Sequence, residues 1–143
     1  MTPKEKGNIG EIQILLEFLK RGVQVSIPFG DNARYDLVAD FGGKLNKIQV
    51  KYCDQEVVNG SISLVCSSSK NHTTNKRLST YERDVDYFAF YIPKWEVSLL
   101  VPIEVISNRS RIQFRMTPTK NNQKSGTHFV QDYLFDTILG TNQ

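Results

Sequence analysis

Apolar residues near the amino terminus recur with the spacing of a helix face. The stripe consists of Ile9, Ile12, Leu15, Leu16 and Leu19, at intervals of three and four residues that are typical of a helix. Thr2-Pro3-Lys4-Glu5 is a capping-box pattern with proline at the first helical position. Gly22 is a residue typical of the end of a helix. The sequence therefore predicts a helix that ends near Gly22 and packs through this stripe.

Shorter alternating runs follow and predict strands at residues 23–28, 35–40, 45–53, 62–66, 86–92 and 95–102, with a further edge strand at 112–116. The second and third runs form a hairpin around a Gly-Gly turn over residues 41–44. Residues 128–139 return to helical spacing, with Val130, Leu134 and Ile138 on one face. A helix, then several strands, then a late helix indicates an α+β fold in which helices pack on a sheet.

Length and composition narrow the class of protein. The chain has 143 residues, 39% hydrophobic and 23% charged, which is typical of a globular protein. We expect one domain over residues 1–143 that needs no disulfide or structural zinc. Cys53 and Cys66 lie in no ligand-like spacing, so we expect reduced, structural thiols. The polar amino terminus and the lack of long apolar runs lead us to expect a soluble, cytoplasmic protein.

The net charge is only +3, but the bases are unevenly placed. Residues 57–81 contain no acid and carry Lys70, Lys76 and Arg77. Residues 105–131 also contain no acid and carry Arg109, Arg111, Arg115, Lys120 and Lys124. Both stretches are rich in Ser, Thr and Asn, which suits phosphate contact, although two solvated surface loops are an equally good interpretation.

The strongest candidate chemistry lies on the hairpin. Side chains alternate along a strand, so Gln49 and Lys51 share one face and Val50 points to the other. Pairing of the two strands brings Asp36 to the same edge of the sheet. Such a cluster can hold a divalent cation and stabilise charge on an attacked phosphate. Alternatively, Asp36 caps the turn over residues 32–34, and the other two side chains are ordinary exposed strand residues.

Glu11 is a second candidate carboxylate, at the border of the apolar helix stripe. Gly7 and Gly10 stand on either side of it, and each costs a helix about 1 kcal/mol relative to alanine. Two glycines at this turn suggest close approach of a sheet or a ligand. Alternatively, they only fray the first turn and Glu11 is a half-exposed carboxylate.

Together these residues resemble the PD-(D/E)XK nucleases, and in particular a branch encoded by group I introns, the homing endonucleases. The similarity extends from residue 5 to 105 through Gly7-Asn8-Ile9-Gly10-Glu11, Ile27-Pro28-Phe29-Gly30-Asp31-Asn32, Tyr35-Asp36-Leu37, Ile48-Gln49-Val50-Lys51, Asp86-Tyr87-Phe88-Ala89 and Leu100-Val101-Pro102-Ile103. The resemblance implies a restriction-endonuclease-like core, in which a central mixed β-sheet is flanked by helices. Similarity to archaeal Holliday-junction resolvases is more distant and confined to the same core.

The resemblance also implies catalytic residues Glu11, Asp36, Gln49 and Lys51. Mg²⁺, for which Mn²⁺ can substitute, would be held by Asp36 and the Val50 carbonyl with direct or water-bridged contacts from Gln49 and Glu11. Gln49 departs from the usual acid of the family motif, and an amide oxygen is a weaker ligand for a hard cation than a carboxylate. The homing-endonuclease branch has the same substitution, so we do not interpret it as inactivation. The role of Lys51, as a base or as a fixed charge, stays open.

The implied activity is metal-dependent double-strand cleavage of DNA at a specific site. A small domain that reads a long site needs symmetry, so we expect a homo-oligomer, dimer or tetramer, on a pseudo-palindrome. Recognition is expected from about 57–81 and 105–127, where Arg109, Arg111 and Arg115 contact either guanine edges or phosphates. Two alternatives share the fold: a structure-specific nuclease like a junction resolvase, and a DNA-binding module that has lost catalysis.

Overall fold

The computed structural model describes residues 1–66, 84–107, 109–116 and 128–140. Sheet A has five strands in the order β1 (Gln24–Ser26), β2 (Leu37–Phe41), β3 (Lys44–Tyr52), β6 (Tyr87–Ile92) and β7 (Val97–Pro102). Sheet B has the order β4 (Val57–Val58), β5 (Ser61–Val65), β8 (Arg111–Arg115) and β9 (His128–Phe129). β3 pairs with β6 and β8 with β9 in parallel, whereas the other pairs are antiparallel.

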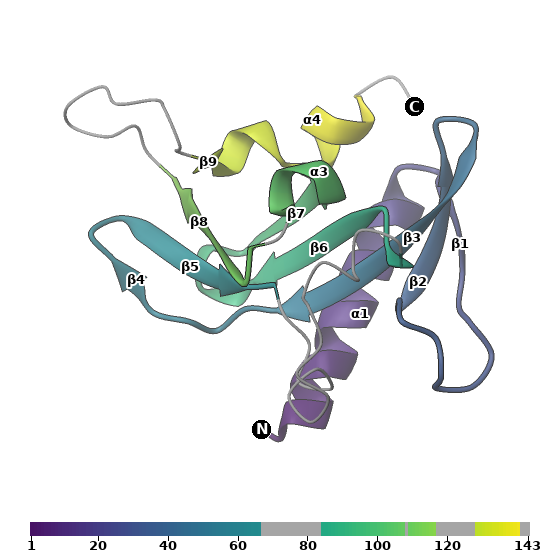
Figure 1. Cartoon of the computed structure of the whole chain (residues 1–143), viewed down its shortest axis with the longest axis horizontal. Coiled ribbons are helices and arrows are strands. Elements are labelled where there is room, and N and C mark those ends of the chain that lie inside the picture. Colours follow the sequence, from purple (N-terminus) through teal and green to yellow (C-terminus); the bar gives the residue numbers. More distant parts are fainter. Residues whose placement is uncertain (67–83, 108, 117–127, 141–143) are drawn as a thin grey trace.

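Helix α1 (Pro3–Lys20) lies behind sheet A in Figure 1. Sheet B packs on the other face of sheet A from the helix. Two short helices, α3 (Ile103–Ile106) and α4 (Phe135–Leu139), and the 3-10 turns η3 (Pro93–Trp95) and η4 (Val130–Asp132) complete the described elements. The prediction of an α+β fold with a central mixed sheet flanked by helices is confirmed. No helix in these ranges is long and apolar enough to cross a membrane.

The amino-terminal helix starts as predicted but packs through a different face. Thr2 and Glu5 form the capping box, with the Glu5 N–H donating to Thr2 Oγ1 at 3.1 Å. The buried residues of α1 are Gly10, Ile14 and Phe18, whereas Ile9, Ile12, Leu16 and Leu19 are exposed. The predicted packing stripe is therefore wrong. The helix is apolar on two sides, and the side that carries Gly10 allows the closer approach to the sheet.

The two glycines of α1 have different environments. A Cβ at Gly10 would lie 3.4 Å from Tyr52 Cβ and 3.5 Å from Val50 Cγ1, whereas a Cβ at Gly7 would meet nothing within 4 Å. The close approach predicted from the glycines therefore holds for Gly10, where the helix contacts β3, and not for Gly7.

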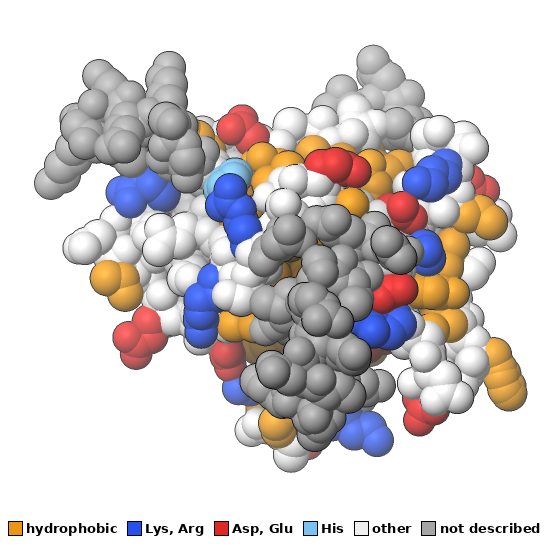
Figure 2. All heavy atoms as spheres, viewed as in Figure 1, with side chains coloured by type: hydrophobic (Ala, Val, Ile, Leu, Met, Phe, Trp, Pro, Cys, Tyr) orange, Lys and Arg blue, Asp and Glu red, His pale blue; other side chains and the backbone are white. Residues whose placement is uncertain are grey.

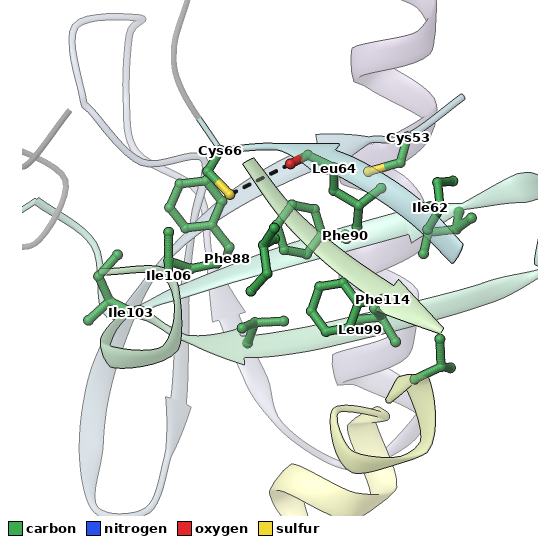
Figure 3. Close-up of a cluster of buried hydrophobic side chains, with 14 of the residues drawn as sticks. Cys53, Ile62, Leu64, Cys66, Phe88, Phe90, Leu99, Ile103, Ile106 and Phe114 are labelled. Carbon is green, nitrogen blue, oxygen red and sulfur yellow. Dashed lines mark hydrogen bonds between the residues drawn. The ribbon is translucent and has the colours of Figure 1, made fainter. Parts of the chain in front are cut away.

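The core has two parts, one on each face of sheet A. Between sheet A and α1 lie side chains that include Ile14, Phe18, Ile48 and Val50. Between sheet A and sheet B lies an aromatic-rich cluster, drawn in Figure 3, that includes Phe88, Phe90, Phe114, Ile62 and Leu64. Cys53 and Cys66 are buried, free thiols in this second cluster, as expected from their spacing.

The carboxyl-terminal prediction of one helix over residues 128–139 is wrong. The chain instead forms β9, then η4, and becomes α-helical only from Phe135. Leu134 is extended, with φ −64° and ψ 153°, and forms a β-bridge with Leu99. Contact with β7 therefore replaces the helical turns that the spacing favoured.

Smaller differences concern the strands and their connections. The strand predicted at residues 112–116 is β8, but it lies between β5 and β9 rather than at an edge. The connection between β6 and β7 is η3. β4 and α3 were not predicted. β4 joins β5 through Asn59 and Gly60, both with positive φ (53° and 79°), as in the tight turns that favour an Asn-Gly pair.

Candidate functional site

The candidate site lies where β2 begins beside β3. The Asp36 N–H donates to Ile48 O at 2.8 Å, and the Asp36 carboxylate accepts a hydrogen bond from the Val50 N–H at 2.8 Å. The side chain therefore binds the backbone of the neighbouring strand. This contact fixes a carboxylate, partly buried, against the middle of β3.

The backbone of β3 presents an oxygen on the same side. Along a strand, the N–H and C=O of one residue point to the same neighbouring strand. The Ile48 carbonyl and the Val50 N–H both meet Asp36, whereas Cys53 and Lys47 bond to β6 and to the residue before it. The Val50 carbonyl therefore points to the side occupied by Asp36.

Gln49 and Lys51 occupy the opposite face of β3 from Val50. Ile48 and Val50 pack in the cluster against α1, so alternation directs Gln49 and Lys51 to the face covered by sheet B. Burial lowers the pKa of the Lys51 ammonium, and the charge of Asp36 opposes this shift. Lys51 is thus a partly desolvated cation within electrostatic range of Asp36.

Glu11 reaches the same carboxylate from α1. It is partly buried, and its pKa is raised by burial and further by the negative charge of Asp36. A small apolar pocket of about 210 Å³ adjoins it, lined by Asn8, Glu11, Ile12, Leu15, Ile27 and Leu37. The fold therefore brings Glu11 and Lys51, from two separate segments, within electrostatic range of Asp36.

The raised pKa of Glu11 predicts that Glu11→Gln raises the melting temperature of the metal-free protein at pH 7–8. A carboxyl whose pKa is higher in the folded state opposes folding when it is ionised in both states, and this cost vanishes once both states are protonated. The gain should therefore shrink as pH falls and disappear below about 4, the ordinary range for glutamate. Thermal unfolding in EDTA as a function of pH measures it, with Glu56→Gln, at an exposed glutamate, as the control. An unchanged or lower melting temperature at pH 8 would contradict the prediction.

The donor set of the site is oxygen-rich but contains few carboxylates. Within the described ranges there is no group of three or more His, Cys, Asp or Glu side chains suited to one metal ion. The candidate ligands are instead two carboxylates, Glu11 and Asp36, the Gln49 amide and the Val50 carbonyl. All are hard oxygen donors, as Mg²⁺ prefers.

The basic residues considered for DNA contact fall into two groups. Lys70, Lys76, Arg77, Lys120 and Lys124 lie outside the described residues. Arg109 and Arg111 are exposed and Arg115 is partly exposed. β8 carries Arg111 and Arg115 on one face together with Gln113, which the sequence analysis did not single out. The sequence signal for Gln113 was its spacing of two residues from each arginine, which places all three side chains on one face of a strand.

Comparison with known proteins identified a matching family and similar solved structures. Residues 1–136 match the family described as PD-(D/E)XK endonuclease. The bacterial homing endonuclease I-Ssp6803I is similar in structure, with 29% identity, a TM-score of 0.61, and coverage of 86% of this chain and 81% of that one. Hjc, a Holliday junction resolvase from Archaeoglobus fulgidus, gives 19% identity and a TM-score of 0.47 over 77% and 84% of the two chains. No curated protein sequence matched.

Proposed function

Because the chain belongs to the PD-(D/E)XK endonuclease family, we propose that it is a site-specific homing endonuclease of the group I intron type, which cuts both strands of DNA. The observation that carries the proposal is the meeting of Glu11, Asp36 and Lys51 at the start of β2. The similarity to a bacterial homing endonuclease, which covers most of both chains, favours homing over the other activities of the family.

Asp36, Glu11, Gln49 and the Val50 carbonyl would hold a Mg²⁺ ion, for which Mn²⁺ can substitute. The fit rests on Asp36, whose carboxylate is fixed on the side to which the Val50 carbonyl points, and on Glu11, close enough for mutual repulsion to raise its pKa. A cation at this position relieves that repulsion. When bound, it would supply Lewis-acid polarisation of the scissile phosphate and acidify an attacking water.

The residues of this chain then have separate tasks. Asp36 accepts a hydrogen bond from the Val50 N–H, so its carboxylate keeps a fixed direction. Lys51 lies on the face turned to sheet B, where burial strengthens its field. There it stabilises negative charge that develops on the attacked phosphate, which is the electrostatic contribution that most lowers such barriers. Gln49, on the same face, orients the phosphate or water through its amide.

We further propose that the active form is a homo-oligomer that pairs through the outer face of α1. Ile9, Ile12, Leu16 and Leu19 are 40%, 65%, 46% and 53% exposed. Their 3-4-3 spacing is that of the apolar seam of a two-helix coiled coil. Glu5 lies in the first turn and Lys20 in the last, so an antiparallel second copy places each Glu5 beside the other copy's Lys20. A two-fold pair of this kind suits a pseudo-palindromic DNA site.

Leu16→Glu is therefore expected to convert the oligomer into smaller species, since it places a charge in the centre of the apolar seam. Sedimentation or light scattering over a range of protein concentration measures the effect, and far-UV circular dichroism checks that the fold is kept. Leu45→Glu is the matched control, because Leu45 is 65% exposed but lies on β3, away from α1. Equal dissociation by both variants, or by neither, would refute this interface.

The activity is tested by incubating the purified protein with plasmid libraries and with branched DNA in Mg²⁺ at fixed salt. Discrete double-strand fragments from the libraries support a homing endonuclease. Cleavage of branched DNA alone indicates a junction-specific nuclease, and sequence-specific binding without cleavage indicates a binding module. Either of the last two results overturns the proposal.

A further inference from the structure

The two longer strands of sheet B, β5 and β8, pair antiparallel at the centre of that sheet. We call this pair the β5–β8 ribbon. One face of this ribbon is apolar and fully buried, and consists of Ile62, Leu64, Ile112 and Phe114. The opposite face carries Ser61, Ser63, Val65, Arg111, Gln113 and Arg115, with Ser63 directly across from Gln113, Ser61 across from Arg115 and Val65 across from Arg111. The buried face fixes the register, because a slip of one residue would expose the core.

The outward face is basic and polar without a carboxylate of its own. Residues 57–66 and 105–116, which include both strands, contain no Asp or Glu. In Figure 2, basic side chains (blue) and uncharged polar side chains and backbone (white) lie over β5 and β8, whose basic residues are arginines. Such a surface attracts a polyanion and offers hydrogen-bond donors and acceptors in alternation.

One end of the ribbon adjoins the candidate catalytic site. Cys66, which follows β5, bonds through its N–H to Ser110 O at 2.8 Å. Burial raises the pKa of the Cys66 thiol to about 12, and the nearby charges of Lys51, Arg109 and Arg111 oppose that shift. Lys51 and the Arg111 end of β8 therefore both lie within electrostatic range of the same thiol. From there the ribbon extends away to the turn at Asn59 and Gly60, beside which the Arg115 guanidinium lies.

The dimensions of the ribbon match those of duplex DNA. Residues on one face of a strand repeat every ~6.8 Å, which is two steps of ~3.4 Å along a DNA strand. Arg111, Gln113 and Arg115 thus span roughly 14 Å, or about four base-pair steps. The major groove is wide enough to admit a two-stranded β-ribbon.

We propose that the β5–β8 ribbon enters the major groove beside the cleaved phosphate and that Gln113 specifies a base there. This proposal rests on the proposed function and names the surface that selects its substrate. A glutamine side chain can form a bidentate pair with adenine through N6 and N7. Gln113 is exposed at the middle of the ribbon, flanked by two arginines that can hold the phosphate backbone or read guanine. Ser63 lies directly across from Gln113, so it would meet the DNA at the same position along the groove.

The test is selection of bound sequences from a randomised duplex library in Ca²⁺, a cation chosen to allow binding while limiting cleavage. Wild type, Gln113→Ala and the matched control Gln24→Ala are compared, since Gln24 is an exposed strand glutamine on the far edge of sheet A. We expect Gln113→Ala to lose adenine preference at one position, or at its symmetry mates, by about 5- to 150-fold. For Gln113→Ala, the slope of log affinity against log salt concentration on random DNA should not change. Arg111→Ala should reduce that slope by the amount of about one phosphate contact.

Three outcomes would overturn the proposal. Identical selected sequences for wild type and Gln113→Ala would overturn the role of the ribbon while leaving the nuclease activity intact. An equal loss of preference in Gln24→Ala would assign the effect to general stability. Absence of any selected sequence for wild type would overturn the proposed function itself, and the ribbon with it.

Discussion

Lys51→Ala is expected to lower the rate of DNA cleavage by at least ~10²-fold, and by ~10³-fold if its charge acts only in the transition state. The ammonium is partly buried on β3 and is in electrostatic contact with Asp36. Its removal therefore takes away the positive charge that we propose acts on the attacked phosphate. DNA binding should be weakened far less, because phosphate contacts elsewhere remain. Single-turnover cleavage and a parallel binding titration measure the two effects.

Two further variants make this result specific. Lys47→Ala removes a lysine from the same strand and the same face, four residues away, so it should cut at nearly the wild-type rate. Lys51→Arg keeps the positive charge but cannot give up a proton near neutral pH. Substantial activity in Lys51→Arg indicates electrostatic stabilisation, whereas complete loss indicates a proton-transfer or strict geometric role. Wild-type cleavage by Lys51→Ala would remove this residue from the mechanism.

Asp36→Asn is expected to abolish cleavage to a similar extent while preserving the fold. An asparagine oxygen can still accept the Val50 N–H, which donates to Asp36 Oδ2 at 2.8 Å, so the strand contact can persist. The negative charge is lost, and with it the strongest proposed ligand for a hard cation. Titration of Mg²⁺ or Mn²⁺ by calorimetry, together with cleavage assays, measures both consequences. The melting temperature in EDTA should change little.

Asp40→Asn is the matched control, because Asp40 lies on the same strand and is exposed. Asp36→Ala adds a second comparison, since it also leaves the Val50 N–H without its partner. We expect it to be less stable than Asp36→Asn by about 1–3 kcal/mol, the cost of an unsatisfied, partly buried donor. Cation affinity that is unaffected by Asp36→Asn would contradict the proposed ligand set.

The hairpin part of the candidate site could be predicted because its determinants are local. The Gly-Gly turn fixes the register of β2 and β3, so Asp36 must lie beside the strand that carries Gln49 and Lys51. Side-chain alternation then places Val50 on the opposite face of β3 from Gln49 and Lys51. The hydrogen bond from Val50 to Asp36 was not predicted, because the start of β2 departs from regular pairing at this residue.

The position of Glu11 depended on information that spacing does not contain. Helix α1 has two apolar sides, and the stripe with the clearer periodicity is exposed. Docking through Gly10 against Val50 and Tyr52 brings Glu11 to Asp36. The same docking leaves Ile9, Ile12, Leu16 and Leu19 on the outer surface, where we propose that a second copy binds.

By itself, the sequence determined the capped helix, most strands and the strand-borne part of the site, since caps, turns and side-chain alternation act over a few neighbouring residues. Only the tertiary structure decided which side of α1 is buried, why residues 128–134 are not α-helical, and that β5 and β8 form one ribbon beside Lys51. Each of these depends on contacts between segments far apart in the chain, such as Leu99 with Leu134 and Cys66 with Ser110. Competition among such contacts outweighs local preference wherever a segment has two comparable ways to pack.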